Sequence, residues 1–432
     1  MPDFSLSISQ PRIIRDPLWN TIRVDPVAAR IMDTPAFQRL RYIRQLGLAH
    51  LVYPGATHTR FDHALGVYHL AGTAVRLLRD RGGVPEHVWE GVQLIPYAAL
   101  LHDIGHFAFS HALEELDQAQ LPGDHEAMSG RFFASAELGE ALAPLGPDAP
   151  ARIQALIQGR SAFPLQGLVN GSLDLDKMEY LRRDARFAGV PYGEVDVDRL
   201  LQGLMLLPDP MGGSYEVGMH EKAASALESL LFARYQMFRN VYWHHAVRSA
   251  TVLYKRIVED SVAGGLLRPD ELIGPTDEWL LFEIGRRAGD GSDPISVRLR
   301  DRWLPALWNR RLPKRAVEIT ASELDGRRVA DWVTGAPDAR RRREDELARE
   351  YGLPPGELFV DYPAKAMFKL NLLVLLRSGE VTRMGDAGLQ GLIDLPRLAR
   401  ELYQTTRVLR VFTLQRTELD RGSILKAVTG NG

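Results

Sequence analysis

The amino-acid sequence repeats apolar side chains at helical spacing up to about residue 262. Helix boundary signals accompany the pattern: a Thr-Pro pair at 34–35 is typical of a helix start, and Gly47 and the Gly82-Gly83 pair are typical of helix ends. The helices expected from spacing and boundaries cover residues 25–47, 63–83, 84–106, 172–189 and 220–259. This part of the chain is therefore predicted to be mainly helical.

The helical pattern weakens beyond residue 262. Residues 338–352 mix charges of both signs, as a solvated helix does, and residues 356–381 are strand-like in composition. We predict a mainly α fold with a helical core over residues 1–262 and a smaller, mixed α+β region over 263–432. The second region is expected to serve oligomerisation or regulation.

Composition narrows the classes of chemistry. The 432 residues are 45% hydrophobic and 25% charged, with a formal net charge of -2, which is typical of a soluble globular protein. Cysteine is absent, which excludes disulfides, thiolate metal sites and a cysteine nucleophile. Any metal must therefore be held by histidine and carboxylate side chains.

Neither a membrane nor a nucleic acid is predicted as a partner. The N-terminal residues lack the pattern of a secretory signal, and the most apolar later stretch, which begins at Leu370, is too short to span a bilayer. The arginine-rich stretches at 309–315 and 340–343 have no interleaved aromatic residues, which argues against nucleic acid. We expect a cytoplasmic protein.

The twelve histidines gather in one part of the chain, between residues 50 and 245. Residues 100–111 read LLHDIGHFAFSH, and His63 lies upstream, with three aspartates downstream between residues 174 and 184. Two imidazoles and two carboxylates from three separate helices would hold a divalent metal and leave positions open for water and a phosphate oxygen. The donor set suits Mn, Fe, Co, Ni, Zn or Mg. A polar helix end without a metal is the alternative.

Six sequence blocks resemble the HD-domain phosphohydrolases, in that family's order. They are DTPAFQRLRYIRQLG, VYPGATHTRFDHALG, LLHDIGHFAFSH, DHE, LDLDKMEYLRRD and RYQMFRNVYWHH, and they lie within residues 10–255. Within the family the sequence is most similar to the deoxynucleoside triphosphate triphosphohydrolases, the dGTPase-like and SAM-and-HD-domain group. The family pattern H…HD…D falls on four residues, which the resemblance implies are the metal ligands: His63, His102, Asp103 and Asp176.

The resemblance also implies how a deoxynucleoside triphosphate would bind. The cations that would hold the triphosphate are Arg60, Lys177 and Arg234. The residues that would read or pack against the sugar are Gln45, Asp184, Tyr180 and Tyr242. The polar wall beside the scissile bond would consist of His106, His111, Glu114 and His125.

The implied reaction releases inorganic triphosphate. Activated water would attack the α-phosphorus, while His125, oriented by Glu114, would protonate the departing 5′-oxygen. The products would be a deoxynucleoside and triphosphate. Tyr242 would collide with a 2′-hydroxyl, which predicts a preference for deoxyribonucleotides.

Each assignment has a plainer alternative. His125 could be a solvated loop histidine, and His106 and His111 could be structural histidines bonded to backbone carbonyls. The three cations could pair with acidic residues on helix surfaces. Tyr180 and Tyr242 could be ordinary core residues.

Regulation and assembly are open at this stage. The residues that resemble the activating-nucleotide site of animal members are Arg12, Asp33, Gln38 and Arg41. Asp33 and Arg41 could equally be helix surface residues. Arg15, Phe238 and Trp243 depart from the family pattern, which leaves nucleotide activation and base preference undecided. We expect a homo-oligomer of two or four chains.

Two other functions are compatible with the same residues. One is a different HD phosphohydrolase, such as a 5′-nucleotidase or a phosphodiesterase. The other is a regulatory module that binds nucleotides or nucleic acid through a degenerate HD core, although all four ligand positions are present.

Overall fold

The computed structural model is mainly helical with small sheets, which confirms the predicted fold class. The described residues are 11–113, 115–116, 125–324, 327–363, 371–385, 394, 397, 401–402, 404 and 406–430. None of the helices in these ranges combines the length and the apolar composition that crossing a membrane requires.

The secondary structure elements have the following bounds. The helices up to residue 263 are α1 (Pro26–Asp33), α2 (Pro35–Gln38), α3 (Arg60–Asp80), α4 (Ile95–Leu101), α5 (Ser110–Leu113), α6 (His125–Phe133), α7 (Ala136–Leu142), α8 (Ala149–Ile157), α9 (Leu175–Ala188), α10 (Val197–Gly203), α11 (Ala224–Met237) and α12 (His245–Ala263). The later helices are α13 (Asp277–Ala288), α14 (Pro294–Arg298), α15 (Leu304–Trp308), α16 (Asp331–Thr334), α17 (Pro337–Glu350) and α19 (Arg421–Thr429). The strands are β1 (Arg12–Asp16), β2 (Asn20–Val24), β3 (Leu204–Pro208), β4 (Tyr215–His220), β5 (Lys314–Thr320), β6 (Leu358–Asp361), β7 (Leu372–Leu375), β8 (Val381–Met384) and β9 (Val408–Thr413).

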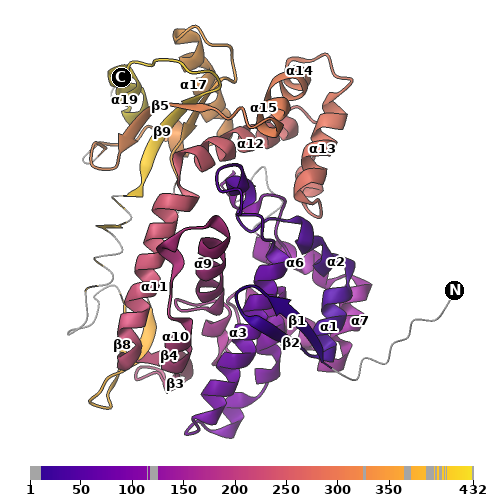
Figure 1. Cartoon of the computed structure of the whole chain (residues 1–432), viewed down its shortest axis with the longest axis vertical. Helices are drawn as coiled ribbons and strands as arrows, with labels where there is room; N and C mark the ends of the chain where they lie inside the picture. Colours follow the sequence, from indigo (N-terminus) through magenta and orange to yellow (C-terminus); the bar gives the residue numbers. More distant parts are fainter. Residues whose placement is uncertain are drawn as a thin grey trace, which may run out of the picture.

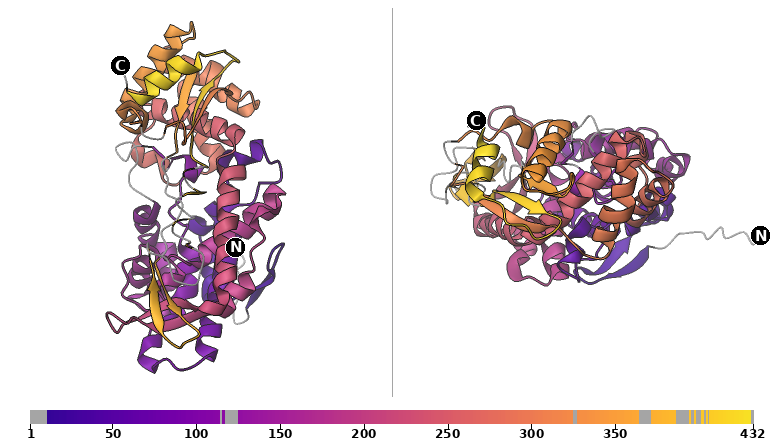
Figure 2. Two further views of the ribbon diagram at one scale, coloured as in Figure 1. Left: turned by 90° about the vertical axis from the view of Figure 1, so that its left-hand side faces the viewer. Right: turned by 90° about the horizontal axis from the view of Figure 1, so that it is seen from above.

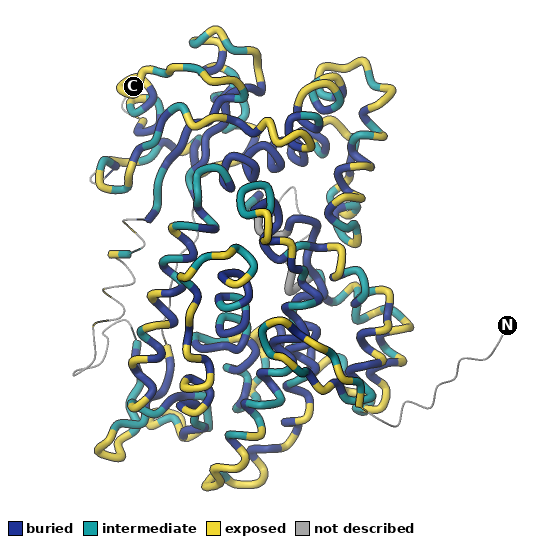
Figure 3. The backbone as a smooth tube through the Cα atoms, viewed as in Figure 1, coloured by how far each residue is buried: buried dark blue, intermediate teal, exposed yellow. Residues whose placement is uncertain are grey.

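Two regions follow one another along the long axis of the molecule (Figure 1). The lower region holds α3, α9, α10 and α11, and the upper region holds α13, α14, α17, α19 and strands β5 and β9. Helix α12 links them, and the left-hand view in Figure 2 shows the same order. It is buried without interruption from Val247 to Ser261 (Figure 3).

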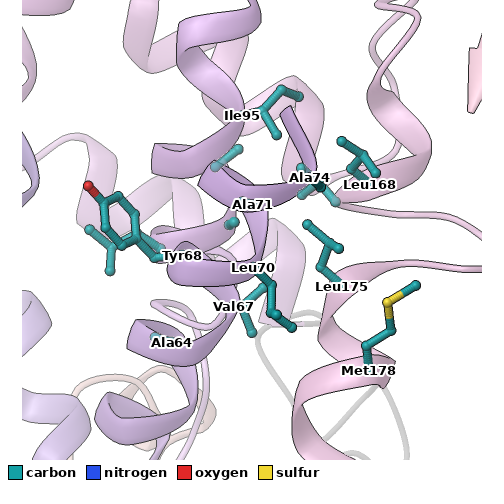
Figure 4. Close-up of a cluster of buried hydrophobic side chains, with 14 of the residues drawn as sticks. Ala64, Val67, Tyr68, Leu70, Ala71, Ala74, Ile95, Leu168, Leu175 and Met178 are labelled. Carbon is teal, nitrogen blue, oxygen red and sulfur yellow. The ribbon is translucent and has the colours of Figure 1, made fainter. Parts of the chain in front are cut away.

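Helix α3 lies at the centre of the lower core. Asp62 N donates to Thr59 Oγ1 at 3.4 Å, and Thr59 N donates to the Asp62 carboxylate at 2.9 Å, so a reciprocal cap starts the helix. Its apolar face then packs on α4 and α9. Figure 4 shows this cluster, with the labelled residues Ala64, Val67, Tyr68, Leu70, Ala71, Ala74, Ile95, Leu168, Leu175 and Met178.

Helix α9 begins at an aspartate cap. Asp174 Oδ1 accepts a hydrogen bond from Lys177 N at 3.0 Å, and the helix ends at Gly189, whose φ of 69° is left-handed. The cap places Asp176 and Lys177 in the first turn of the helix, facing the C-terminal end of α4. This helix and α3 confirm the helices predicted over 172–189 and 63–83.

The helix predicted over 220–259 is two helices, α11 and α12, with a π-helical turn over Phe238–Tyr242 between them. Trp243 N donates to Phe238 O at 2.8 Å, the i to i−5 bond of such a turn. His244 then caps α12, because its Nδ1 accepts from Ala246 N at 3.3 Å. π-Turns inside helices are frequent at functional sites, and this one borders a cavity of about 840 Å³.

The helices predicted over 25–47 and 84–106 are also shorter than expected. Thr34 ends α1 and caps α2, and Pro35 occupies the first position of α2, so one apolar pattern is divided between two helices. Gly91, with a φ of 86°, interrupts the second pattern, and only α4 is an α-helix there.

The hairpin β1–β2 was not predicted. Its strands pair antiparallel from Arg12↔Val24 to Asp16↔Asn20, and Asn20 takes the left-handed conformation with a φ of 59°. Asp16 Oδ1 fixes the turn by accepting from Leu18 N and Trp19 N, each at 2.8 Å.

The remaining sheets combine distant segments. Strand order is β3-β4-β7-β8 in one sheet and β5-β9-β6 in the other. Strand β7, which comes after residue 262, thus pairs with β4, which precedes it, and β8 pairs with β7. Both later strands contribute residues to the hydrophobic core of the lower region. The division of the chain at residue 262 stays a prediction.

Candidate metal and phosphate site

The four predicted metal ligands meet where three helices converge. His63 lies on α3, His102 and Asp103 follow α4, and Asp176 lies in the first turn of α9. His63 Nε2 is 3.2 Å from His102 Nε2 and 3.0 Å from Asp176 Oδ1. One ligand atom from each of His63, His102 and Asp103 lies within 4.8 Å of the others. The structure therefore brings together the whole H…HD…D set.

Outer hydrogen bonds orient both imidazoles. His63 Nδ1 is 2.6 Å from Glu179 Oε2, and His102 Nδ1 is 2.8 Å from the carbonyl oxygen of Ala99. When Nδ1 carries the proton and donates it outward, Nε2 keeps a lone pair for a metal. Both Nε2 atoms face the point where the carboxylates converge.

The electrostatics of this point favour a cation. Burial alone lowers the pKa of His63, but its hydrogen bonds to Asp176 and Glu179 outweigh burial and raise that pKa to about 10. Burial also opposes ionisation of Asp103, yet the Arg60 guanidinium and His102 hold the pKa of Asp103 well below its usual value. Two imidazole nitrogens with two ionised carboxylates fit a divalent metal held by nitrogen and oxygen donors.

Arg60 lies directly beside this cluster of candidate metal ligands. Its Nη1 donates to Asp103 Oδ2 at 2.6 Å, and His106 Nε2 lies 2.8 Å from the other oxygen, Oδ1. The arginine is 2% exposed, and its Nε and Nη2 have no hydrogen-bond partner among the described residues. Buried N–H groups without a protein acceptor indicate a place for an anionic ligand.

A cavity of about 840 Å³ opens in front of the cluster. It reaches from the ends of α4 and α9 past the π-turn to the strand β6. The predicted site residues that line it are Gln45, Arg60, His102, Asp103, His106, Asp176, Lys177, Tyr180, Asp184, Arg234 and Tyr242. Its size suits a small-molecule ligand.

Two family models match the chain around this site. The HD domain matches residues 60–158, which include His63, His102 and Asp103, and the HD-associated region matches residues 195–392. The chain belongs to the HD-domain phosphohydrolase superfamily. HD domains are metal-dependent, so the His-His-Asp cluster is this HD-domain protein's candidate metal site.

Curated relatives of this HD-domain protein include characterised enzymes. It is 30% identical to the deoxynucleoside triphosphate triphosphohydrolase SAMHD1 of Gallus gallus, over 54% of this chain and 42% of the relative. It is 34% identical to the uncharacterized protein YwfO of Bacillus subtilis, over 58% of this chain and 56% of the relative. A Methanocaldococcus jannaschii protein is 29% identical over 90% of this chain and 76% of its own length. The chain thus spans about half the length of most of these relatives.

Solved structures share the fold over almost the whole chain. A hypothetical protein from Aquifex aeolicus has a TM-score of 0.69 and 26% identity, covering 94% of this chain and 96% of that one. A phosphohydrolase from Bacteroides thetaiotaomicron has a TM-score of 0.70 and 20% identity, covering 94% of this chain, which shows the fold alone.

Two of the predicted sugar-reading residues, Asp184 and Tyr242, are hydrogen-bonded to each other in the HD-domain protein. Tyr242 donates its hydroxyl to Asp184 Oδ2 at 2.6 Å, and His58 Nε2 lies 2.8 Å from Asp184 Oδ1. Gln45 is buried. It lies next to His58, because its backbone N donates to the carbonyl oxygen of His58 at 3.0 Å. Burial raises the pKa of Tyr180 and of Tyr242, so both rings stay neutral at physiological pH.

The other two predicted phosphate-binding cations differ in their surroundings. Lys177 Nζ donates to Gly171 O at 3.0 Å and contacts the carboxylate of Asp174. The guanidinium of Arg234 lies 5.6 Å from the centre of the Phe238 ring. Both side chains line the cavity. Their binding of phosphate stays a prediction.

Most of the predicted polar wall lies outside the residues that can be described. His106 is 4% exposed and bonds to Asp103. Glu114 is outside the described residues, as are the side chains of His111 and His125. Their roles beside the scissile bond stay predictions.

The residues predicted to bind an activating nucleotide form two pairs on the surface. Arg12 and Asp33 make a bidentate ion pair at 2.7 and 2.5 Å, and Arg41 Nε donates to Gln38 Oε1 at 2.9 Å. The Arg41 guanidinium also stacks over Phe61, 3.5 Å from the ring centre. A nucleotide at this place stays a prediction.

Two residues of the site were missed by sequence reasoning. They are His58, which bonds to Asp184, and Glu179, which bonds to His63. A usable signal exists for Glu179: it lies three residues after Asp176, so a single helix face presents both carboxylates.

Proposed function

We propose that this chain is a metal-dependent hydrolase of deoxynucleoside triphosphates, with deoxynucleoside and inorganic triphosphate as products. One observation carries the proposal most directly: the buried Arg60 guanidinium, with two nitrogens that have no hydrogen-bond partner among the described residues, adjoins the metal-donor cluster in a ligand-sized cavity. The chicken and human SAMHD1 enzymes, 30% and 26% identical, support the substrate class.

The phosphate end of the substrate would lie against Arg60, Lys177 and Arg234. Arg60 is held by Asp103 through Nη1, which leaves Nε and Nη2 to donate to phosphoryl oxygens. A metal held by His63, His102, Asp103 and Asp176 would polarise the phosphoryl group and lower the pKa of a nearby water. The residues themselves orient the phosphate and compensate its charge.

The sugar end would lie against the group around Asp184. Its carboxylate is engaged by Tyr242 and His58, which fixes the Tyr242 ring. A fixed ring packed against C2′ leaves no room for an added hydroxyl, whereas Asp184 and Gln45 offer partners for a 3′-hydroxyl. His125 would then protonate the 5′-oxygen as the bond to the α-phosphorus breaks.

The decisive experiment measures which products form. The purified chain is incubated with dGTP, dATP, dCTP or dTTP and each of Mn²⁺, Fe²⁺, Co²⁺, Ni²⁺, Zn²⁺ and Mg²⁺, and the products are separated by anion-exchange chromatography. Deoxynucleoside and triphosphate in equal amounts support the proposal. Orthophosphate released from monophosphates would instead identify a nucleotidase, and turnover of no nucleotide with any metal would identify a binding module.

Arg60→Gln provides a matched test of the phosphate contact. It should lower kcat/KM for the deoxynucleotide by about tenfold to a hundredfold, the usual worth of a hydrogen bond to a charged group. Arg76→Gln, at an exposed position on the same helix, should leave kcat/KM unchanged. Equal values for the two variants would remove Arg60 from the binding site.

We further propose that the active form is a homo-oligomer and that a nucleotide at Arg12, Asp33, Gln38 and Arg41 modulates it. Sedimentation with and without added dGTP tests both statements. A monomer under both conditions would contradict them.

A further inference from the structure

The hairpin β1–β2 is connected to the metal ligand His63 through two buried side chains of α9. Glu179 Oε2 lies 2.6 Å from His63 Nδ1. The other oxygen, Oε1, accepts from Arg183 Nε at 2.7 Å and from Trp19 Nε1 at 3.0 Å. Arg183 Nη2 in turn lies 3.0 Å from Asp16 Oδ2 in the hairpin.

The connection is buried except at Trp19, which is partly exposed. Glu179 and Arg183 are each 0% exposed, and Asp16 is 9% exposed. A buried ion pair of this kind is rigid, because water does not replace a lost partner.

Space for Glu179 is provided by Gly66 on α3. A Cβ at that position would collide with the Glu179 carboxylate. Gly66 follows His63 by three residues, so it lies on the same helix face as the imidazole that Glu179 orients. The close approach of α3 and α9 and the contact to His63 therefore depend on the same glycine.

We propose that Asp16, Trp19, Glu179 and Arg183 are positioning residues of the metal site. Through them the N-terminal hairpin holds the His63 imidazole with Nε2 directed at the metal, and so sets metal affinity. None of the four lies in the ranges matched by the HD-domain and HD-associated models. The inference rests on the proposed function only in taking His63 as a ligand.

The hairpin end of this connection can be altered without substituting the predicted metal ligands or Glu179. Asp16→Asn keeps an oxygen to accept from Leu18 N and Trp19 N and removes the charge that faces Arg183. Trp19→Phe removes the N–H that Glu179 accepts and keeps an aromatic ring. Thr21→Val is the matched control, because it removes a contact to Arg15 within the same hairpin.

The measured quantity is the dissociation constant of Mn²⁺ or Co²⁺ for the full chain without nucleotide, by competition with a chromophoric chelator. Glu179→Gln should weaken binding by about 10–100-fold, as outer hydrogen bonds to metal ligands usually do. Asp16→Asn and Trp19→Phe should weaken metal binding by about twofold to tenfold, which is the change in affinity that corresponds to the net free energy of one hydrogen bond. Both should also shift the visible absorption bands of bound Co²⁺, which report ligand geometry.

A merely structural hairpin gives a different result. In that case Asp16→Asn and Trp19→Phe would lower the thermal midpoint of the metal-free chain but bind Co²⁺ with the affinity and spectrum of wild type and of Thr21→Val, which would overturn the proposal. Because no nucleotide is present, this outcome is independent of whether the chain hydrolyses deoxynucleotides. If Glu179→Gln does not fold, the two hairpin variants decide alone.

Discussion

Replacing Asp277 with asparagine tests how one buried carboxyl group makes stability depend on pH. Asp277 begins α13 and is 0% exposed, and its two oxygens accept from Phe109 N at 2.7 Å and from Arg44 N at 2.9 Å. Burial raises the pKa of Asp277 to about 6, although these N–H donors oppose the rise. The carboxyl group thus ties the upper region of the molecule to the loop that comes after His106.

The direction in which stability changes with pH is set by the pKa of Asp277 in the folded chain and in the unfolded chain. An unfolded aspartate has a pKa of about 3.9, so between about pH 4 and pH 6 the folded chain keeps the Asp277 proton and the unfolded chain does not. The free energy of unfolding therefore falls as pH rises through this window and is level above it. A shift of about two pKa units at 1.36 kcal/mol each gives about 3 kcal/mol.

Urea unfolding followed by circular dichroism from pH 4 to pH 8 measures this fall. It should be present in wild type and in the control Asp270→Asn, whose carboxylate is exposed and pairs with Arg268. It should be about 3 kcal/mol smaller in Asp277→Asn. Above pH 6 that variant should be less stable than wild type by about 1–3 kcal/mol, because one buried N–H loses its acceptor. Towards pH 4 the difference should grow by about 3 kcal/mol, because only wild type gains stability there. An unchanged pH slope in Asp277→Asn would refute the reasoning.

Three further predictions concern the site. Asp176→Ala should lose metal and hydrolysis together, as metal analysis and turnover would show, because it removes one of four protein ligands; full activity would contradict the ligand assignment. His125→Ala should keep the metal and lose about 10²–10⁴-fold in turnover, the worth of a positioned acid; metal loss in step with activity would make it a ligand instead. Wild type should prefer dGTP to GTP on the order of 10²-fold, and Tyr242→Ala should narrow the ratio of kcat/KM mainly by admitting GTP; equal wild-type values would remove the steric argument.

The helical core and the metal donors could be predicted because their signals are local. A Thr cap with Asp three residues later starts α3, and the Asp174 cap starts α9, so the sequence places His63 and Asp176 near helix starts. The hairpin β1–β2 could not be predicted, because each strand is five residues long and Asp16, whose side chain fixes the turn, pairs with Arg183, far along the chain. The pairing of β4 with β7 depends on contacts of similarly long range.

The break between α11 and α12 shows why the cavity itself was harder to anticipate than its residues. Apolar spacing continues through Phe238–Tyr242, so a single helix was the natural prediction, but the π-turn inserts an extra residue and rotates α12 relative to α11. Tyr242 can then donate to Asp184 on α9 while Arg234, two turns earlier, lines the same cavity. A regular helix would separate these two side chains by a different angle around its axis, because 3.6 residues make one turn. The predicted sugar-reading group and the predicted phosphate-binding cation therefore share one cavity through a backbone irregularity that neither residue signals by itself.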